Sequence, residues 1–376
     1  MKLTKNIYIR LSLLFCGVFT LLLGGCSAES PLLPEDVALT FQLSLPGSLE
    51  VTTRAEPDKK LDEIIINNVW VVQYNANTGA DDGTFIMAKM FANDAIGYRE
   101  NNQTIKVTTS EFSNYQSRFY IIVNAGDTFL DAFKQETTSD RSESALQKLT
   151  MNITAGATDE PTLLTCGPLE YKPDKSQVVL VAPLQRAFAR IKIAWKKTTD
   201  FEGKITMDEV KVMNLPEYMA LYIRGGGSLA TNYPETADIN TDFTTIGTTA
   251  LKEGEGRIFY MGENLRGTGT GSSFSDKGLE AKGPGGTLAG CTCLVLVGNY
   301  EYPNLTTDNP GKVKVEYRIY LGGNLMKDYN IQRGYEYQLT VNISGINSAD
   351  VRVTITDGAV VVFDKVETIT KEVDFR

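Results

Sequence analysis

Histidine is absent from all 376 residues of this sequence. Its absence removes the commonest general base, the His-dependent catalytic triads and the usual zinc sites. The sequence also contains no H-E-x-x-H, no G-x-S-x-G and no glycine-rich phosphate-binding loop that ends in Lys-Ser or Lys-Thr. We therefore expect no enzyme activity, no catalytic residue, no cofactor and no metal.

Basic residues are outnumbered, with 37 Lys and Arg against 46 Asp and Glu, and the formal net charge is −9. Binding to nucleic acid requires clusters of Lys and Arg that neutralise the phosphates, so we expect no nucleic-acid partner. An acidic surface is typical of an exported protein that must remain in solution.

Long apolar runs are scarce. Leu11 to Leu23 is about thirteen residues long, which is too short for the roughly 20 residues of a membrane-spanning helix. The run follows a basic N-terminal stretch and precedes Gly24-Gly25-Cys26. This order predicts a lipoprotein signal peptide over residues 1–25, with acyl chains such as palmitate anchoring Cys26 to the outer membrane. The alternative is an ordinary secretory signal followed by an incidental cysteine.

Cysteine is also rare, and three cysteines remain after the signal and the lipid site: Cys166, Cys291 and Cys293. Cys291 and Cys293 are two residues apart in a strand-like run, so both side chains point to one face and do not easily bridge each other. We expect all three to be small buried residues. A disulfide from Cys166 to Cys291 or to Cys293 is the alternative.

What the sequence does contain is a pervasive alternation of apolar and polar residues, the pattern of half-buried strands. The first such strand carries Val37, Leu39, Phe41, Leu43 and Leu45 on one face and ends before Pro46-Gly47. The same pattern predicts strands at residues 64–74, 104–109, 118–124, 178–183, 188–195, 207–213, 256–261, 291–300, 312–321, 335–343, 351–356, 359–363 and 366–375. Two short helices are expected at residues 128–134 and 142–149.

Many short strands separated by turn residues predict an all-β fold. We expect two β-sandwich domains of the transthyretin-like, Greek-key type with few short helices. A removable propeptide would span residues 26–54, the N-terminal sandwich 55–190 and the C-terminal sandwich 191–345. Residues 346–376 would then form a C-terminal extension.

A single arginine follows the first strand in a polar stretch, in the order Thr53-Arg54-Ala55. It predicts a proteolytic processing site between Arg54 and Ala55. Lys59-Lys60 offers an alternative position for the cut, and an exposed arginine with no such role is the other alternative.

Taken in order along the chain, these features resemble the fimbrillin subunits of type V pili of Gram-negative anaerobes. The lipobox, and the first strand followed by Arg54, match that family. So do the segments Arg186–Ile191 and Tyr260–Gly267, the second being close to the family's Tyr-x-x-Glu-Asn-x-x-Gly. The run Tyr329–Ile343 is also similar, with Gly334 where relatives often carry Asn.

The resemblance implies a surface fimbrium that assembles by strand exchange and supports adhesion. An Arg-specific extracellular protease would remove the lipid anchor together with the first strand. A neighbouring subunit, either another copy or a related pilus subunit, would then fill the open groove in a head-to-tail polymer. Five lost apolar side chains correspond to an order of 10 kcal/mol of burial before ordering costs. The candidate donor residues are Val351, Val353, Ile355, Val360, Val362, Ile369, Val373 and Phe375.

Two alternatives remain from the sequence. The C-terminal residues can be the last strands of the C-terminal domain itself. The whole chain can instead be a surface-anchored glycan-binding lipoprotein, which would present exposed aromatic side chains to sugars. Trp70 and Trp195 both lie inside strand-like runs, so we expect them in the core rather than at such a site.

Overall fold

The computed structural model describes most of the chain between residues 38 and 344 and three short C-terminal strands. The described residues are 38–45, 65–77, 79–92, 104–109, 112–126, 129, 141–154, 156–159, 161–173, 179–199, 201–222, 233–234, 236–273, 276–278, 290–301, 312–324, 326–344, 353–356, 361–362 and 370–375.

Strands dominate this part of the chain, which confirms the predicted all-β class. The first group of elements is β1 (Leu39–Ser44), β2 (Asn68–Asn75), β3 (Phe85–Ala92), β4 (Thr104–Thr109), β5 (Ser117–Val123), α3 (Glu143–Gln147), β6 (Thr150–Asn152), β7 (Leu164–Tyr171), β8 (Val179–Pro183) and β9 (Gln185–Arg186). The second group is β10 (Phe188–Lys197), β11 (Lys204–Met213), β12 (Leu215–Pro216), β13 (Tyr218–Ala220), η2 (Thr236–Asp238), β14 (Ile239–Asn240), β15 (Thr244–Thr245), β16 (Arg257–Gly262), β17 (Cys293–Glu301), β18 (Lys312–Tyr320), β19 (Tyr335–Ile343), β20 (Val353–Thr356), β21 (Val361–Val362) and β22 (Thr370–Phe375).

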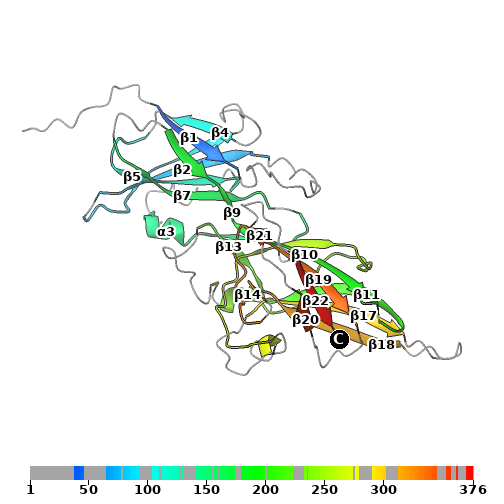
Figure 1. The fold of residues 1–376 in the computed structure, drawn as a ribbon. Helices are drawn as coiled ribbons and strands as arrows, with labels where there is room; N and C mark the ends of the chain where they lie inside the picture. The colour runs from blue at the N-terminus through cyan, green and yellow to red at the C-terminus, as the bar shows by residue number, and fades with distance from the viewer. Residues whose placement is uncertain are drawn as a thin grey trace, which may run out of the picture. The chain divides into compact units, whose positions relative to one another are not determined.

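The first group forms two facing sheets, with strand orders β4-β1-β8 and β3-β2-β5-β7-β9 (Figure 1). Side chains from both sheets form one apolar core, to which Phe41, Val71, Ile121 and Leu180 all belong. Strand β1 alternates buried and half-buried residues along its length, as a strand with one face on a core must. This sandwich is therefore closed by the first strand of the described chain.

The outer face of the five-stranded sheet carries a second apolar cluster that contains Trp70 and Tyr120. Helix α3 is fixed over this face by a carboxylate, because Glu143 accepts hydrogen bonds from Arg118 Nε at 2.7 Å and from Tyr120 Oη at 2.5 Å. The hydrogen bond to Glu143 is the largest cause of the raised pKa of Arg118. The predicted helix at residues 142–149 is confirmed by α3, which begins after the capping residue Ser142.

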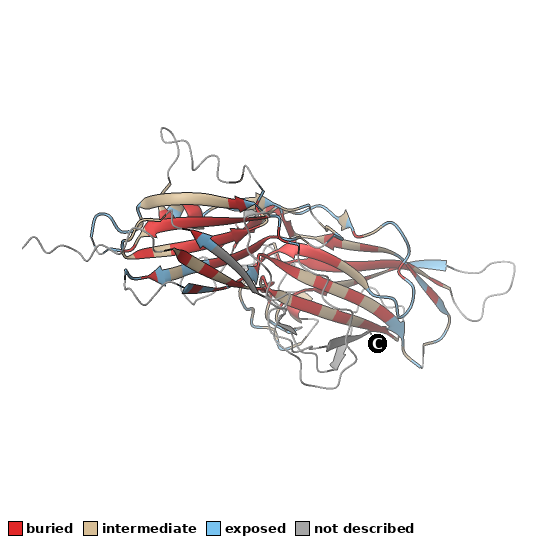
Figure 2. Ribbon diagram, turned by 90° about the horizontal axis from the view of Figure 1, so that it is seen from above, coloured by how far each residue is buried: buried red, intermediate tan, exposed pale blue. Residues whose placement is uncertain are grey.

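Most strands of the second group form two sheets around one core, with orders β16-β10-β19-β22-β20 and β15-β11-β17-β18. Strand β12 pairs with β14 in a separate two-stranded sheet, and β13 pairs with β6 of the first group. Ile191, Trp195, Val210, Leu296 and Tyr317 belong to this core. Figure 2 shows the alternation of buried and half-buried residues along its strands. Trp70 and Trp195 are 0% and 3% exposed, so their predicted core positions are confirmed.

Two long strands do not show the alternation of apolar and polar residues that predicted the others. In β3 nearly every residue is half-buried, so its apolar residues show no period of two. In β7, Gly167-Pro168 lies where the register with β5 shifts between Phe119 and Ile121. Gly167 has φ +142°, and a Cβ there would lie 2.8 Å from the Tyr120 ring, so this bulge requires glycine.

The chain passes from β9 in one sheet to β10 in the other at Ala187. The predicted boundary between residues 190 and 191 falls inside β10, whose first residue Phe188 pairs with Gly262 of β16. The division into two domains and a C-terminal extension stays a prediction. The expected helix at residues 128–134 lies outside the described residues, apart from Phe129.

Candidate functional site

Strand β1 lies between two strands that come from later in the chain. It pairs antiparallel with β4, from Leu39 opposite Thr109 to Ser44 opposite Thr104. It pairs parallel with β8, from Thr40 opposite Val179 to Ser44 opposite Pro183. Because β1 occupies the middle of this sheet, its loss would leave the inner edges of both β4 and β8 without hydrogen-bond partners.

The inward side chains of β1 are almost fully enclosed. Leu39, Phe41, Leu43 and Leu45 are 1%, 0%, 0% and 7% exposed. The outward side chain of Thr40 lies 3.0 Å from the Thr108 hydroxyl, oxygen to oxygen. The predicted inward face is thus present at four of its five positions, and the fifth, Val37, lies outside the described residues.

The predicted lipid-bearing Cys26 and the predicted cut between Arg54 and Ala55 also lie outside the described residues. Their order along the chain still matters, since β1 lies between Cys26 and Arg54. A cut after Arg54 would therefore separate β1 covalently from every other described strand.

The C-terminal candidate donor residues lie partly in strands of the chain's own sheet. Strand β22 pairs parallel with β19 and antiparallel with β20, while β21 pairs with β19 (Figure 1). Val353 and Ile355 belong to β20, Val362 to β21, and Val373 and Phe375 to β22. Val351, Val360 and Ile369 lie outside the described residues. In the single chain these strands thus extend the second sandwich, and their use as a donor stays a prediction.

Three segments that carry the family resemblance are brought together by ion pairs. Arg333 Nη2 lies 3.1 Å from Glu263 Oε2, and both side chains are 4% exposed. Arg190 Nη1 lies 3.3 Å from Glu336 Oε2 on the strand that runs parallel beside it. The segments around residues 186–191, 260–267 and 329–343 therefore meet at one place in the fold.

Asn264 hydrogen-bonds the segment at residues 260–267 to neighbouring parts of the chain. Its Nδ2 donates to the Gly290 carbonyl at 2.9 Å and to the Thr292 hydroxyl at 2.8 Å. Its Oδ1 accepts from Arg266 Nε at 2.5 Å, and Arg266 also donates to the Pro234 carbonyl. These buried, hydrogen-bonded polar groups give the segment a structural role, since a buried amide or guanidinium must be satisfied.

The three described cysteines are buried and reduced. Cys166 belongs to the core closed by β1, whereas Cys291 and Cys293 belong to a separate cluster that also contains Val295 and Tyr320. The expectation of small buried residues is confirmed, and no disulfide forms among these described cysteines. Burial raises the pKa of the Cys166 thiol to about 12 and is the largest cause of a similar rise to about 12 at Cys291.

Within the described ranges no group of three or more acidic or cysteine side chains could hold a metal ion. Among the same residues, no helix combines the length and hydropathy that crossing a membrane requires.

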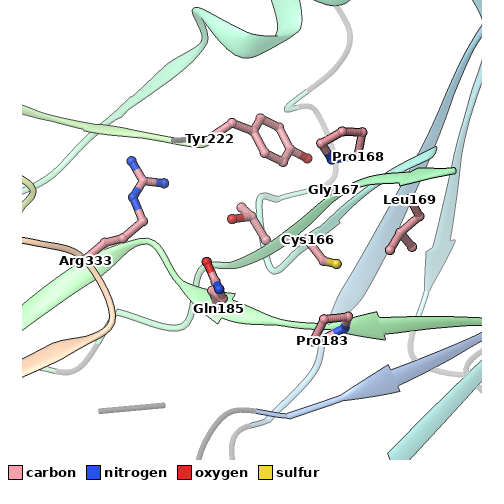
Figure 3. Close-up of a pocket in the computed structure, with 9 residues that line it drawn as sticks. Cys166, Gly167, Pro168, Leu169, Pro183, Gln185, Tyr222 and Arg333 are labelled. Carbon is pink, nitrogen blue, oxygen red and sulfur yellow. The ribbon is translucent and has the colours of Figure 1, made fainter. Parts of the chain in front are cut away.

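One hollow in the described surface was not predicted from the sequence. A cavity of about 250 Å³ is lined by Thr165, Cys166, Gly167, Pro168, Leu169, Pro183, Gln185, Tyr222 and Arg333 (Figure 3). Its lining comes from four distant parts of the chain, so no local pattern could have indicated it. Two lining residues carry a sequence signal: Arg333 lies in the similar run at residues 329–343, and Cys166 is one of the predicted buried cysteines.

Comparisons with known proteins agree with this architecture. A family model described as a domain of unknown function, DUF4906, matches residues 259–341, the part of the chain that contains both Glu263 and Arg333. No curated protein sequence matches the chain.

Among solved structures, the chain is similar to a candidate cell adhesion protein of Parabacteroides distasonis, with 12% identity, a TM-score of 0.53, and coverage of 82% of this chain and 89% of that chain. It also matches a fimbrial assembly protein of that species, with 14% identity, a TM-score of 0.42, and coverage of 88% and 98%. The tip fimbrial protein Mfa3 of Porphyromonas gingivalis gives 9% identity, a TM-score of 0.41, and coverage of 80% and 92%. The first likeness shows a shared fold, in line with the resemblance found in the sequence.

Proposed function

We propose that this chain is a structural subunit of a surface fimbrium that supports adhesion. In this proposal it is exported as a lipoprotein through Cys26, cut between Arg54 and Ala55, and polymerised by strand exchange. The resemblance of the sequence to fimbrillins and the fold shared with a candidate cell adhesion protein support the assignment.

The observation that carries the proposal is the position of β1. It is the middle strand of its sheet, its inward side chains are buried, and the predicted cut follows it in the chain. Four buried apolar side chains at ~1.5–3 kcal/mol each correspond to about 6–12 kcal/mol before ordering costs. A chain that loses this strand has a strong driving force to accept another.

A neighbouring subunit can supply that strand by pairing with β4 and β8. A donated strand gains backbone hydrogen bonds along both edges, with apolar side chains entering at alternate positions. A contact in which each subunit donates to the next is heterologous and does not close on itself, so it builds a filament. The strands over residues 353–375 are the proposed donor, and they would have to leave β19 to act in this way.

Treatment of the purified precursor with an Arg-specific protease tests the proposal. We expect wild-type protein to lose its N-terminal segment and to form SDS-resistant ladders. Arg54→Lys should leave the precursor intact and monomeric, because the lysine keeps the charge but is not a substrate. Ladders formed equally well by uncut Arg54→Lys protein would contradict the proposal.

A further inference from the structure

The cavity beside Arg333 has the construction of a small-ligand site. Its floor consists of Thr165, Cys166, Tyr222 and Arg333, which are 5%, 8%, 5% and 5% exposed. The other residues that line it, among them Pro168, Pro183 and Gln185, are exposed or half-buried and form the rim (Figure 3). A ligand can enter from solvent through the open rim and approach the buried floor.

Arg333 brings to this floor one nitrogen without a hydrogen-bond partner among the described residues. Its Nη1 donates to the Leu221 carbonyl at 3.0 Å and its Nη2 to Glu263 at 3.1 Å. Its Nε is buried and has no hydrogen-bond partner in the described part of the chain. A buried guanidinium N–H without an acceptor is costly, so a ligand oxygen that reaches Nε after a small shift of the Arg333 side chain would relieve a real deficit.

Thr165 adds an acceptor next to this donor. Its hydroxyl donates to the same Leu221 carbonyl at 2.9 Å, which leaves the lone pairs of its oxygen for another group. Gln185, at the rim, offers both an amide donor and an acceptor. A molecule that carries both acceptors and donors, as a hydroxylated ring does, would complement these groups.

The charge of the site favours a neutral ligand. Among the described residues that line the cavity, Arg333 is the only charged one, and Glu263 already neutralises it. The Cys166 thiol stays protonated at neutral pH, since burial raises its pKa to about 12. An anionic ligand would lie near the Glu263 carboxylate and lose its own hydration without gaining a new counter-charge.

The size of the cavity and its apolar surface narrow the class of ligand further. The volume of about 250 Å³ falls below the roughly 300–1,000 Å³ of sites for drug-sized ligands. The Tyr222 ring, Pro168, Pro183 and Leu169 give the cavity apolar walls (Figure 3). A single sugar ring combines C–H faces for such walls with hydroxyl groups for Arg333 and Thr165. We propose that this cavity binds one neutral monosaccharide unit of a glycan.

The proposal is tested with the purified full chain in detergent, by saturation-transfer NMR against methyl glycosides of glucose, galactose, mannose, fucose and the two N-acetylhexosamines. Glucuronic and sialic acid serve as charged comparators. We expect saturable millimolar binding of at least one neutral glycoside and weaker binding of both acids. Gln185→Trp, which fills the mouth of the cavity, should weaken binding about tenfold or more. A tenfold change corresponds to about 1.4 kcal/mol of binding free energy.

Matched variants separate this site from an unspecific effect. Thr165→Val and Arg333→Lys should each weaken binding, whereas Gln116→Trp, at the residue that precedes β5 and does not line the cavity, should not. Circular dichroism checks folding, and Gln185→Trp keeps the test informative if a buried variant fails to fold. No binding of any neutral glycoside, preference for an acidic sugar, or binding unchanged by Gln185→Trp would overturn the proposal. Loss of ladder formation in Gln185→Trp without any sugar binding would also overturn it, by making the cavity a contact between subunits.

Discussion

The ring of Phe41 in β1 packs edge-on against the ring of Phe119 in β5, with centroids 5.1 Å apart and ring planes at 67°. Both side chains are 0% exposed, and they belong to opposite sheets of the first sandwich. Phe41 precedes Arg54 in the chain and Phe119 follows it. This contact thus links two segments: the proposed cut removes the one that contains Phe41, and the one that contains Phe119 stays in the subunit.

Phe41→Ala should destabilise the precursor by about 3–5 kcal/mol, because it empties a fully buried ring position between two sheets. The processed polymer should match the wild-type polymer, since neither contains β1. Urea unfolding of the precursor and heat dissociation of sheared polymer measure the two effects. Phe243→Ala, at a position 49% exposed, is the control, with an expected change within about 0.5 kcal/mol. Equal weakening of precursor and polymer would show that β1 remains in place.

The buried cysteines should report the opening of the groove. With its pKa raised from 9.0 to about 12, Cys166 holds about a thousandfold less thiolate at pH 8 than an ordinary thiol, so alkylation should be slow. Removal of β1 opens the core that contains Cys166 but not the cluster that contains Cys291. Iodoacetamide labelling followed by peptide mass spectrometry after the cut should therefore show faster modification of Cys166 alone. Faster alkylation of Cys291 as well as Cys166 would indicate general unfolding.

Glu263→Gln should lower the free energy of unfolding by about 3–5 kcal/mol, because it leaves the buried Arg333 guanidinium without its counter-charge. Glu301→Gln removes a surface partner of Lys312, whose ammonium lies 2.8 Å from the carboxylate, and should change the stability far less, because solvent screens an exposed ion pair. Chemical denaturation of both variants in the same background measures the difference. A loss for Glu263→Gln as small as that for Glu301→Gln would contradict the structural role of the buried pair.

Alkaline pH should unfold the protein through its buried tyrosines. Burial raises the pKa of Tyr120, Tyr317, Tyr320 and Tyr337 above the ordinary value near 10. The unfolded chain then binds fewer protons than the folded one above about pH 10, so stability is full below that pH and falls as pH rises. Absorbance of tyrosinate during an alkaline titration should show a late step coincident with loss of near-ultraviolet circular dichroism. A smooth titration of all tyrosines near pH 10 with the fold intact would contradict this.

Alternation in the sequence predicts well those strands that have one face on a core. The strands at residues 104–109 and 335–343 have the predicted bounds, and β1 differs only at its ends. β3 and β7 could not be found in this way, because one is half-buried on both faces and the other is interrupted by Gly167-Pro168. A period of two appears only where burial itself alternates.

The candidate sites also differ in whether a local sequence pattern could predict them. The apolar face of β1 is a local pattern, so four of its residues could be predicted to share a buried face. The meeting of Glu263 with Arg333, and of Thr165 with Tyr222 at the cavity, depends on sheet packing across long sequence separations. Such partners follow from the tertiary fold rather than from any local period.

If the mature subunit lacks β1, protein taken from the cell surface must begin after that strand. N-terminal sequencing and intact mass would be measured on protein sheared from the cell surface. We expect an N-terminus at Ala55 and no lipid. A blocked, lipidated Cys26 on all of the material would contradict it and would favour a subunit or binding protein that stays anchored.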